Sequence, residues 1–116
     1  MKENIIRDKT LAFGKRIVRL CVHLEKTKKE FVLSKQLIRS GTSPGAMVRE
    51  SEHSESRKDF IHKLSIALKE ANESEYWIQL LKEGNFISET EFKSIHDDCL
   101  ETVSYTHLTL PTTPYV

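Results

Sequence analysis

Apolar residues recur at alternating intervals of four and three positions along most of this 116-residue chain. Such spacing places side chains on one face of an α-helix, whereas one face of a strand needs a period of two. In residues 4–27 the series has one polar member and consists of Ile6, Thr10, Phe13, Ile17, Leu20 and Leu24. The pattern predicts an amphipathic helix that buries this face against other helices.

Two further segments repeat this spacing. The series in residues 31–52 consists of Phe31, Ser34, Ile38, Gly41, Gly45 and Val48. The series in residues 57–83 consists of Phe60, Leu64, Ala67, Ala71, Ser74, Ile78 and Leu81. Both segments are predicted to be helical. Pro44 lies inside the second segment, and proline within a helix removes one hydrogen bond and clashes with the carbonyl four residues earlier, so a kink or a restart is expected near residue 44.

Capping signals set the remaining boundaries. Ser56 precedes the third helix in a pattern that resembles a capping box, and Gly84-Asn85 is a stop signal. Ser88 and Glu91 complete a full capping box, which predicts that a fourth helix begins at residue 89 and runs to about Thr102.

The last fourteen residues, 103–116, differ from the rest of the chain. They read VSYTHLTLPTTPYV, have no helical period and contain several threonines. The run resembles the in-frame translation of a transposase adapter used to build sequencing libraries. On that interpretation residues 103–116 form a non-native or disordered tail, and the natural fourth helix is cut short. The alternative is a genuine β-like or disordered extension.

Short turns between successive helices make neighbours antiparallel. The predicted fold is therefore all-α, an up-down-up-down antiparallel four-helix bundle over residues 1–102 with a truncated fourth helix and a non-helical tail. Hydrophobic residues make up 38% of the chain, yet no apolar run approaches the roughly 20 residues that a membrane helix needs. Without an apolar signal core near Met1, the expected location is the cytoplasm.

The net charge of +1 hides an asymmetry. Residues 1–30 carry nine Lys and Arg against four Asp and Glu, whereas residues 61–116 carry four against nine. The basic first third could contact nucleic-acid phosphates, or it could pair with the acidic second half of the chain. The candidate nucleic-acid contacts are Lys15, Arg16, Arg19, Lys26, Lys28 and Lys29.

A second stripe on the first helix consists of Leu11, Gly14, Val18 and Cys21. It makes the apolar arc wider than one helix contact requires, so this helix is either central to the bundle or shared with another subunit. Gly41 and Gly45 form a small-xxx-small pair that would let another helix approach closely. Trp77 lies at helical spacing beside Tyr76 and is interpreted as a packing or interface residue. The candidates for packing or oligomer contact are Leu11, Gly14, Val18, Gly41, Gly45 and Trp77.

No constellation of residues points to an enzyme. Glycine-rich phosphate loops, nucleophile elbows and Cys-x-x-Cys pairs are absent from the sequence. Two weak metal-like spacings occur, Glu50 to His53 and Asp59 to His62, but Asp59 is better explained by helix capping. Cys21 and Cys99 fall on apolar stripes and are interpreted as small buried hydrophobes. We therefore predict no catalytic, cofactor, metal or small-molecule site.

Three stretches carry a family resemblance. FVLSKQLIRSGTS (Phe31–Ser43), KDFIHKLSIALKEA (Lys58–Ala71) and Glu75-Tyr76-Trp77 resemble the four-helix-bundle proteins that intervening sequences in bacterial 23S rRNA genes encode. The resemblance covers about residues 4–102. One departure stands out: the family usually has a Gly-Ala-Asn element followed by an acidic pair, where this chain reads GAMVRES (Gly45–Ser51).

The resemblance implies a four-helix bundle, often a homopentamer, with no established enzyme activity. A similar group, the accessory variability determinant of diversity-generating retroelements, is a strongly basic pentamer that looks like a nucleic-acid binder. Two functions follow as hypotheses. The first is a non-enzymatic, self-associating scaffold or interaction module. The alternative is an accessory protein that binds RNA or DNA through the basic face of its first helix.

Overall fold

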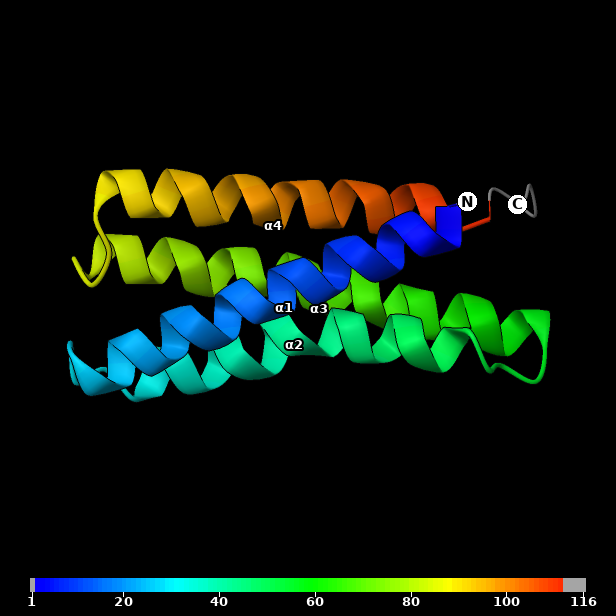
Figure 1. Cartoon of the computed structure of the whole chain (residues 1–116), viewed down its shortest axis with the longest axis horizontal. Helices are drawn as coiled ribbons and strands as arrows, with labels where there is room; N and C mark the ends of the chain where they lie inside the picture. Colours follow the sequence, from blue (N-terminus) through cyan, green and yellow to red (C-terminus); the bar gives the residue numbers. More distant parts are fainter. Residues whose placement is uncertain (1, 112–116) are drawn as a thin grey trace.

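The computed structural model describes residues 2–111, with side chains from residue 5, and within that range the chain has four helices and no strand. Successive helices run antiparallel along a body that measures 45 × 23 × 22 Å (Figure 1). Their bounds are Lys2–Lys26 (α1), Val32–Ser51 (α2), Arg57–Glu83 (α3) and Glu89–Thr109 (α4). The predicted up-down-up-down bundle is confirmed.

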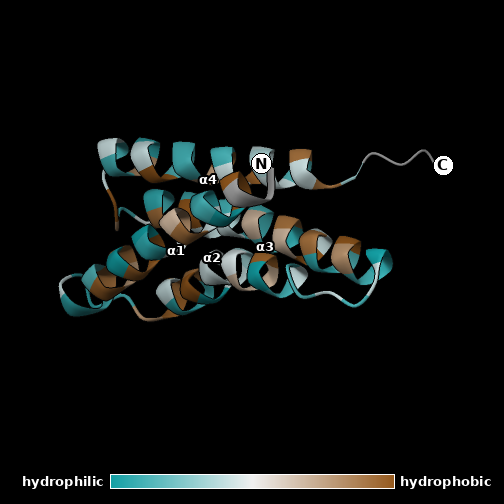
Figure 2. Cartoon of the chain, turned by 45° about the vertical axis from the view of Figure 1, so that its right-hand side comes forward, coloured by the Kyte–Doolittle hydropathy of each residue, from teal (hydrophilic) through white to brown (hydrophobic). Residues whose placement is uncertain are grey.

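Each helix packs against two neighbours only. α1 contacts α2 and α4, and α3 contacts the same two helices, so the cross-section is a square. Hydrophobic and hydrophilic bands alternate along all four helices (Figure 2). α1 is therefore not central to the bundle, and the rest of the chain covers only part of its wide apolar arc.

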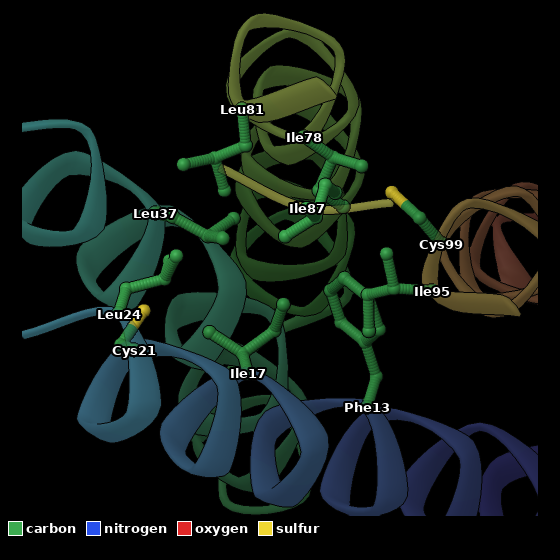
Figure 3. Packing of buried hydrophobic residues seen from close by; sticks show 10 residues of the cluster. All are labelled: Phe13, Ile17, Cys21, Leu24, Leu37, Ile78, Leu81, Ile87, Ile95 and Cys99. Atoms are coloured by element: carbon green, nitrogen blue, oxygen red, sulfur yellow. The ribbon is translucent and has the colours of Figure 1, made fainter. Parts of the chain in front are cut away.

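The predicted helix faces form the core. Five of the six residues in the α1 series are buried, and Phe13 and Ile17 point toward residues of the other three helices (Figure 3). The larger of two clusters contains Phe13, Ile17, Cys21, Leu24, Leu37, Ile78, Leu81, Ile87, Ile95 and Cys99. The small residues Ala67, Ala71 and Ser74 are fully buried along α3, as expected for close packing.

The helix ends follow the capping signals. The Ser88 backbone N–H donates to Glu91 Oε1 at 2.7 Å, and the Glu91 N–H donates to Ser88 Oγ at 3.1 Å. The bond from the Ser88 backbone N–H holds the pKa of the Glu91 carboxyl below its usual value. At α3, Ser56 Oγ accepts from the Asp59 N–H at 3.0 Å. Both predicted starts, at residues 57 and 89, are confirmed.

Pro44 does not interrupt α2, which runs unbroken from Val32 to Ser51. The predicted alternative of a restart near residue 44 is wrong. The Pro44 side chain is buried, and buried residues on both sides of it in α2, Ser40 and Val48 among them, anchor the flanking turns. Packing on both sides keeps the chain helical despite the missing N–H.

The predicted end of the fourth helix at about Thr102 is also wrong, because α4 continues to Thr109. Thr106 is fully buried and donates from Oγ1 to the Thr102 carbonyl at 2.7 Å. Ile95, Cys99, Thr102 and Thr106 extend the four-three spacing, and burial of small threonines overrides their low helix propensity. Residues 112–116 of the predicted tail lie outside the described residues. The adapter origin of residues 103–116 stays a prediction.

Candidate interaction surface

The outer face of α1 exposes large apolar side chains. Leu11, Val18 and Val22 each leave 42–44% of their surface in contact with solvent. Scattered single hydrophobes are common on protein surfaces, but recurrence along one helix marks an interaction face. Within the described residues α1 contacts only α2 and α4, so no third helix of the bundle covers this face.

A groove of about 620 Å³ runs between α1 and α2 beside this face, and we call it the α1–α2 groove. Seven small or apolar residues form its floor: Thr10, Leu11, Gly14, Val18, Thr42, Gly45 and Ala46. Four cations line its rim: Arg7, Lys15, Arg19 and Arg49. No Asp or Glu lies among these lining residues, so the groove is apolar at its base and positively charged at its edges.

Glycines bring the two walls of the groove together. A Cβ added to Gly41 would lie 2.7 and 2.8 Å from the two γ-carbons of Ile17, so α1 and α2 meet closely at this point. Gly14 lies opposite the Gly41 carbonyl, and Gly45 lies opposite Thr10. The small-residue pair on α2 therefore receives α1 of the same chain. Because Gly14 and Gly45 have no side chains, the outer edge of this contact stays hollow.

The structure divides the six predicted nucleic-acid residues among three places. Arg16 turns toward α4, where Nη1 lies 2.5 Å from Asp98 Oδ2 and Nη2 donates to Ser94 Oγ at 3.0 Å. Lys15 and Arg19 lie on the rim of the α1–α2 groove. The remaining three, Lys26, Lys28 and Lys29, are exposed at the end of α1 and in the following turn. Among these six residues, Arg16 is the one with an ion pair in the described part of the chain.

A second groove, of about 380 Å³, lies on the opposite flank of α1, against α4. Its charged residues are Asp8, Asp98 and Glu101 with a single lysine, Lys9, and Ile5 contributes exposed apolar surface. Lys9 hydrogen-bonds to Glu101, and this bond raises the lysine pKa. The two flanks of α1 therefore carry opposite charge.

Trp77 lies away from both grooves. Its indole Nε1–H donates to Glu73 Oε2 at 2.9 Å, and its ring packs against the large core cluster and the edge of Tyr76. The Trp77 hydrogen bond is the largest influence that lowers the pKa of the Glu73 carboxyl. Tyr76 itself is exposed, so this pair contributes mainly to packing on α3.

Neither cysteine has the environment of a reactive thiol. Burial raises the pKa of Cys21 and of Cys99 to about 12, so both stay protonated at neutral pH. No group of three or more His, Cys, Asp or Glu that could hold a metal ion occurs among residues 5–111, whose side chains the structure describes. No helix among residues 2–111 is long and apolar enough to cross a membrane.

Sequence reasoning missed Arg7 and Arg49 as part of the groove. Arg7 precedes Leu11 by four residues and Arg49 follows Gly45 by four, so helical spacing alone placed each beside a predicted interface residue. The acidic flank formed by Asp8, Asp98 and Glu101 was missed because it joins residues from opposite ends of the chain.

Comparison with known proteins identifies a family and a solved structure to which this chain is similar. The sequence model described as 23S rRNA-intervening sequence protein matches residues 2–107. A crystal structure of a protein of unknown function from the S23 ribosomal protein family of Bacteroides thetaiotaomicron is 49% identical in sequence. It superposes with a TM-score of 0.94 over 97% of this chain and 100% of that one. No curated protein matches the chain.

Proposed function

Since this chain belongs to the 23S rRNA-intervening sequence protein family, we propose that it is a non-enzymatic module that assembles with further copies of itself through the α1–α2 groove. The observation that carries the proposal is the apolar outer face of α1, where Leu11 and Val18 border the groove and remain 42% exposed. Burial of such surface is the main favourable term in protein association.

The shape of the groove supports a protein partner. Its floor of glycine, alanine and threonine is open to a side chain or a helix ridge from outside, and the neighbouring Leu11 and Val18 would lose contact with water on docking. Each buried Å² of apolar surface contributes about 25 cal/mol. A stable interface needs roughly 800 Å² on each partner, so the contact must extend beyond the groove along the exposed face of α1 to Val22.

We expect Val18→Asp to abolish self-association, because an unpaired carboxylate would have to be buried at the centre of the interface. Native mass spectrometry and light scattering after gel filtration measure the subunit number. The wild-type chain is expected to form a defined ring. The family resemblance implies a pentamer, that is, five copies of the 13.4 kDa chain.

The matched control for this experiment is Val32→Asp. Val32 is 73% exposed at the start of α2, outside the groove, so the same change there should leave the subunit number unaltered. Circular dichroism should show that both variants keep the helical content of the wild type. A wild-type chain that is monomeric at tens of micromolar would contradict the proposal.

A second candidate function is nucleic-acid binding, and the cationic rim of the groove favours it. Lys15 and Arg19 lie on that rim, and Lys26, Lys28 and Lys29 are exposed further along the same helix and turn. A ring of copies would multiply these contacts. The net charge of +1 is small for a dedicated nucleic-acid binder, so we place this function second.

Salt dependence tests the second candidate. If a fluorescent 20-nucleotide RNA binds through these cations, its affinity should fall by a factor of about 10 or more between 50 and 200 mM salt. The triple change Lys15→Glu, Arg19→Glu and Lys26→Glu should abolish binding, whereas the same reversal at Lys58 and Lys69 on α3 should reduce it little. Binding that is equal in both variants, or insensitive to salt, would rule out this basic face.

A further inference from the structure

We infer that the contact between copies is head-to-tail: the α1–α2 groove of one copy receives the acidic outer face of α4 from the next copy. This inference rests on the self-association proposed above. We define that face by Asp97, Leu100 and Glu101. All three precede residue 103, so the inference does not depend on the C-terminal segment.

Charge excludes the simplest alternative, in which two grooves face each other across a two-fold axis. The rim of each groove carries Lys15, Arg19 and Arg49, which have no ion pair among the described residues, and Arg7, which pairs with Glu52 at 3.6 Å. A symmetric pairing would bring six unpaired cations together at the edge of a partly desolvated interface. Like charges placed opposite one another cost several kcal/mol and discriminate strongly against a partner. The groove therefore requires an acidic occupant.

The outer face of α4 has the chemistry that the groove requires. Asp97, Leu100 and Glu101 are spaced by three and four residues, so they share one face of the helix. Leu100 is 43% exposed, and the side chains of Asp97 and Glu101 are 60% and 51% exposed. An apolar residue flanked by two carboxylates complements an apolar floor flanked by four cations.

Within the chain Asp97 has an exposed lysine as its partner, and Glu101 has a lysine that is 33% exposed. Asp97 pairs with Lys93 on the same helix at 3.2 Å, and Glu101 pairs with Lys9. The Lys93 and Asp97 side chains are both more than half exposed, and such pairs contribute at most about 1 kcal/mol. They can therefore be exchanged for contacts with Lys15, Arg19 or Arg49 of another copy at little cost.

The two surfaces lie on different sides of the molecule. α2 and α4 make no contact with each other, and both flank α1 (Figure 1). One copy can thus offer its α4 face and its groove at the same time. A repeated contact of this kind closes into a ring when the rotation between copies allows it.

Complementation between two defective variants tests the inference. Val18→Asp spoils the groove and keeps the α4 face, whereas Asp97→Lys with Glu101→Lys spoils the α4 face and keeps the groove. Each variant alone is expected to be monomeric by native mass spectrometry. An equimolar mixture should form a one-to-one dimer, because it contains one intact pair of surfaces. The control is Glu55→Lys with Glu83→Lys, the same charge change at exposed residues elsewhere, which should assemble like the wild type.

Each contrary outcome has a distinct meaning. An Asp97→Lys, Glu101→Lys variant that is helical and assembles like the wild type would overturn the head-to-tail contact and leave self-association standing. A mixture that stays monomeric would overturn it as well. A wild-type chain that is itself monomeric after nuclease treatment would overturn the proposed function and this inference together. If the untreated protein also carries RNA, nucleic acid would replace a second copy as the occupant of the groove.

Discussion

Gly41→Ala is expected to destabilise the bundle by about 1–3 kcal/mol, the cost of overpacking a filled core. The new Cβ would lie 2.7 and 2.8 Å from the γ-carbons of Ile17 and 3.2 Å from its Cβ. Ile17 is fully buried, and its β-branched side chain has few rotamers into which it could move. α1 and α2 would therefore have to separate, which also distorts the groove between them.

Gly45→Ala is the matched control, four residues along the same helix. Its Cβ would lie 3.5 Å or more from Thr10, an ordinary van der Waals distance. Alanine also stabilises a helix interior by up to about 1 kcal/mol relative to glycine. Urea unfolding followed by circular dichroism, at one fixed chain concentration because assembly adds to apparent stability, should separate the two variants. Equal midpoints would show that α1 and α2 do not depend on close approach at Gly41.

The fold could be predicted largely from the sequence because its main signals are local. The apolar series of α1 and the capping box at Ser88 and Glu91 depend on residues within a few positions of one another. The two errors concern places where distant contacts prevail over local preference. Pro44 stays helical between two packed turns, and Thr106 is held helical by burial.

The candidate surface could be predicted only in part, for a geometrical reason. The apolar stripe at Leu11 and Val18 was visible from helical spacing. Lys15 and Arg16 are adjacent in sequence, yet about 100° of helix rotation separates them, so one reaches the groove and the other reaches Asp98 on α4. Which side of α1 each cation faces depends on where α2 and α4 dock, and that information is not local.

His96 shows the same limit. The run His96-Asp97-Asp98 is typical of a solvated face, but His96 Nε2 lies 2.8 Å from Glu75 Oε2 and the ring stacks on Phe92. The contact with Glu75 ties α4 to α3, the ring stack fixes His96 within α4, and Asp97 stays on the outer side. The partial burial of His96 and the exposure of Asp97 give α4 the acidic face that the head-to-tail contact uses.

Glu30→Ala is expected to destabilise the fold by about 2–3 kcal/mol, more than a usual capping residue. The Glu30 carboxylate accepts backbone N–H bonds from Val32, Leu33 and Ser34 at 3.1, 2.7 and 2.7 Å. Phe31 precedes α2 without any side-chain capping bond, so this carboxylate is the cap of the helix. Its charge also suits the positive end of the helix dipole.

Glu30 further joins the end of α1 to the start of α2. Its own backbone N–H donates to the Leu24 carbonyl at 2.9 Å, and its carbonyl accepts from Ser34 Oγ at 2.9 Å. Loss of the carboxylate should therefore loosen both the connection between α1 and α2 and the first helical turn of α2. Glu30→Gln, which keeps an acceptor oxygen and loses the charge, should fall between the wild type and Glu30→Ala.

The control for the loss of charge is Glu25→Ala, an exposed carboxylate on the last turn of α1 that makes one long contact with Ser34 Oγ at 3.4 Å. Its removal should change stability by less than about 0.5 kcal/mol, as for most surface substitutions. If Glu30→Ala were to unfold at the same urea concentration as Glu25→Ala, water would be satisfying the first N–H groups of α2. The turn would then not fix how α1 lies against α2, and the alignment of the groove walls would rest on Gly41 alone.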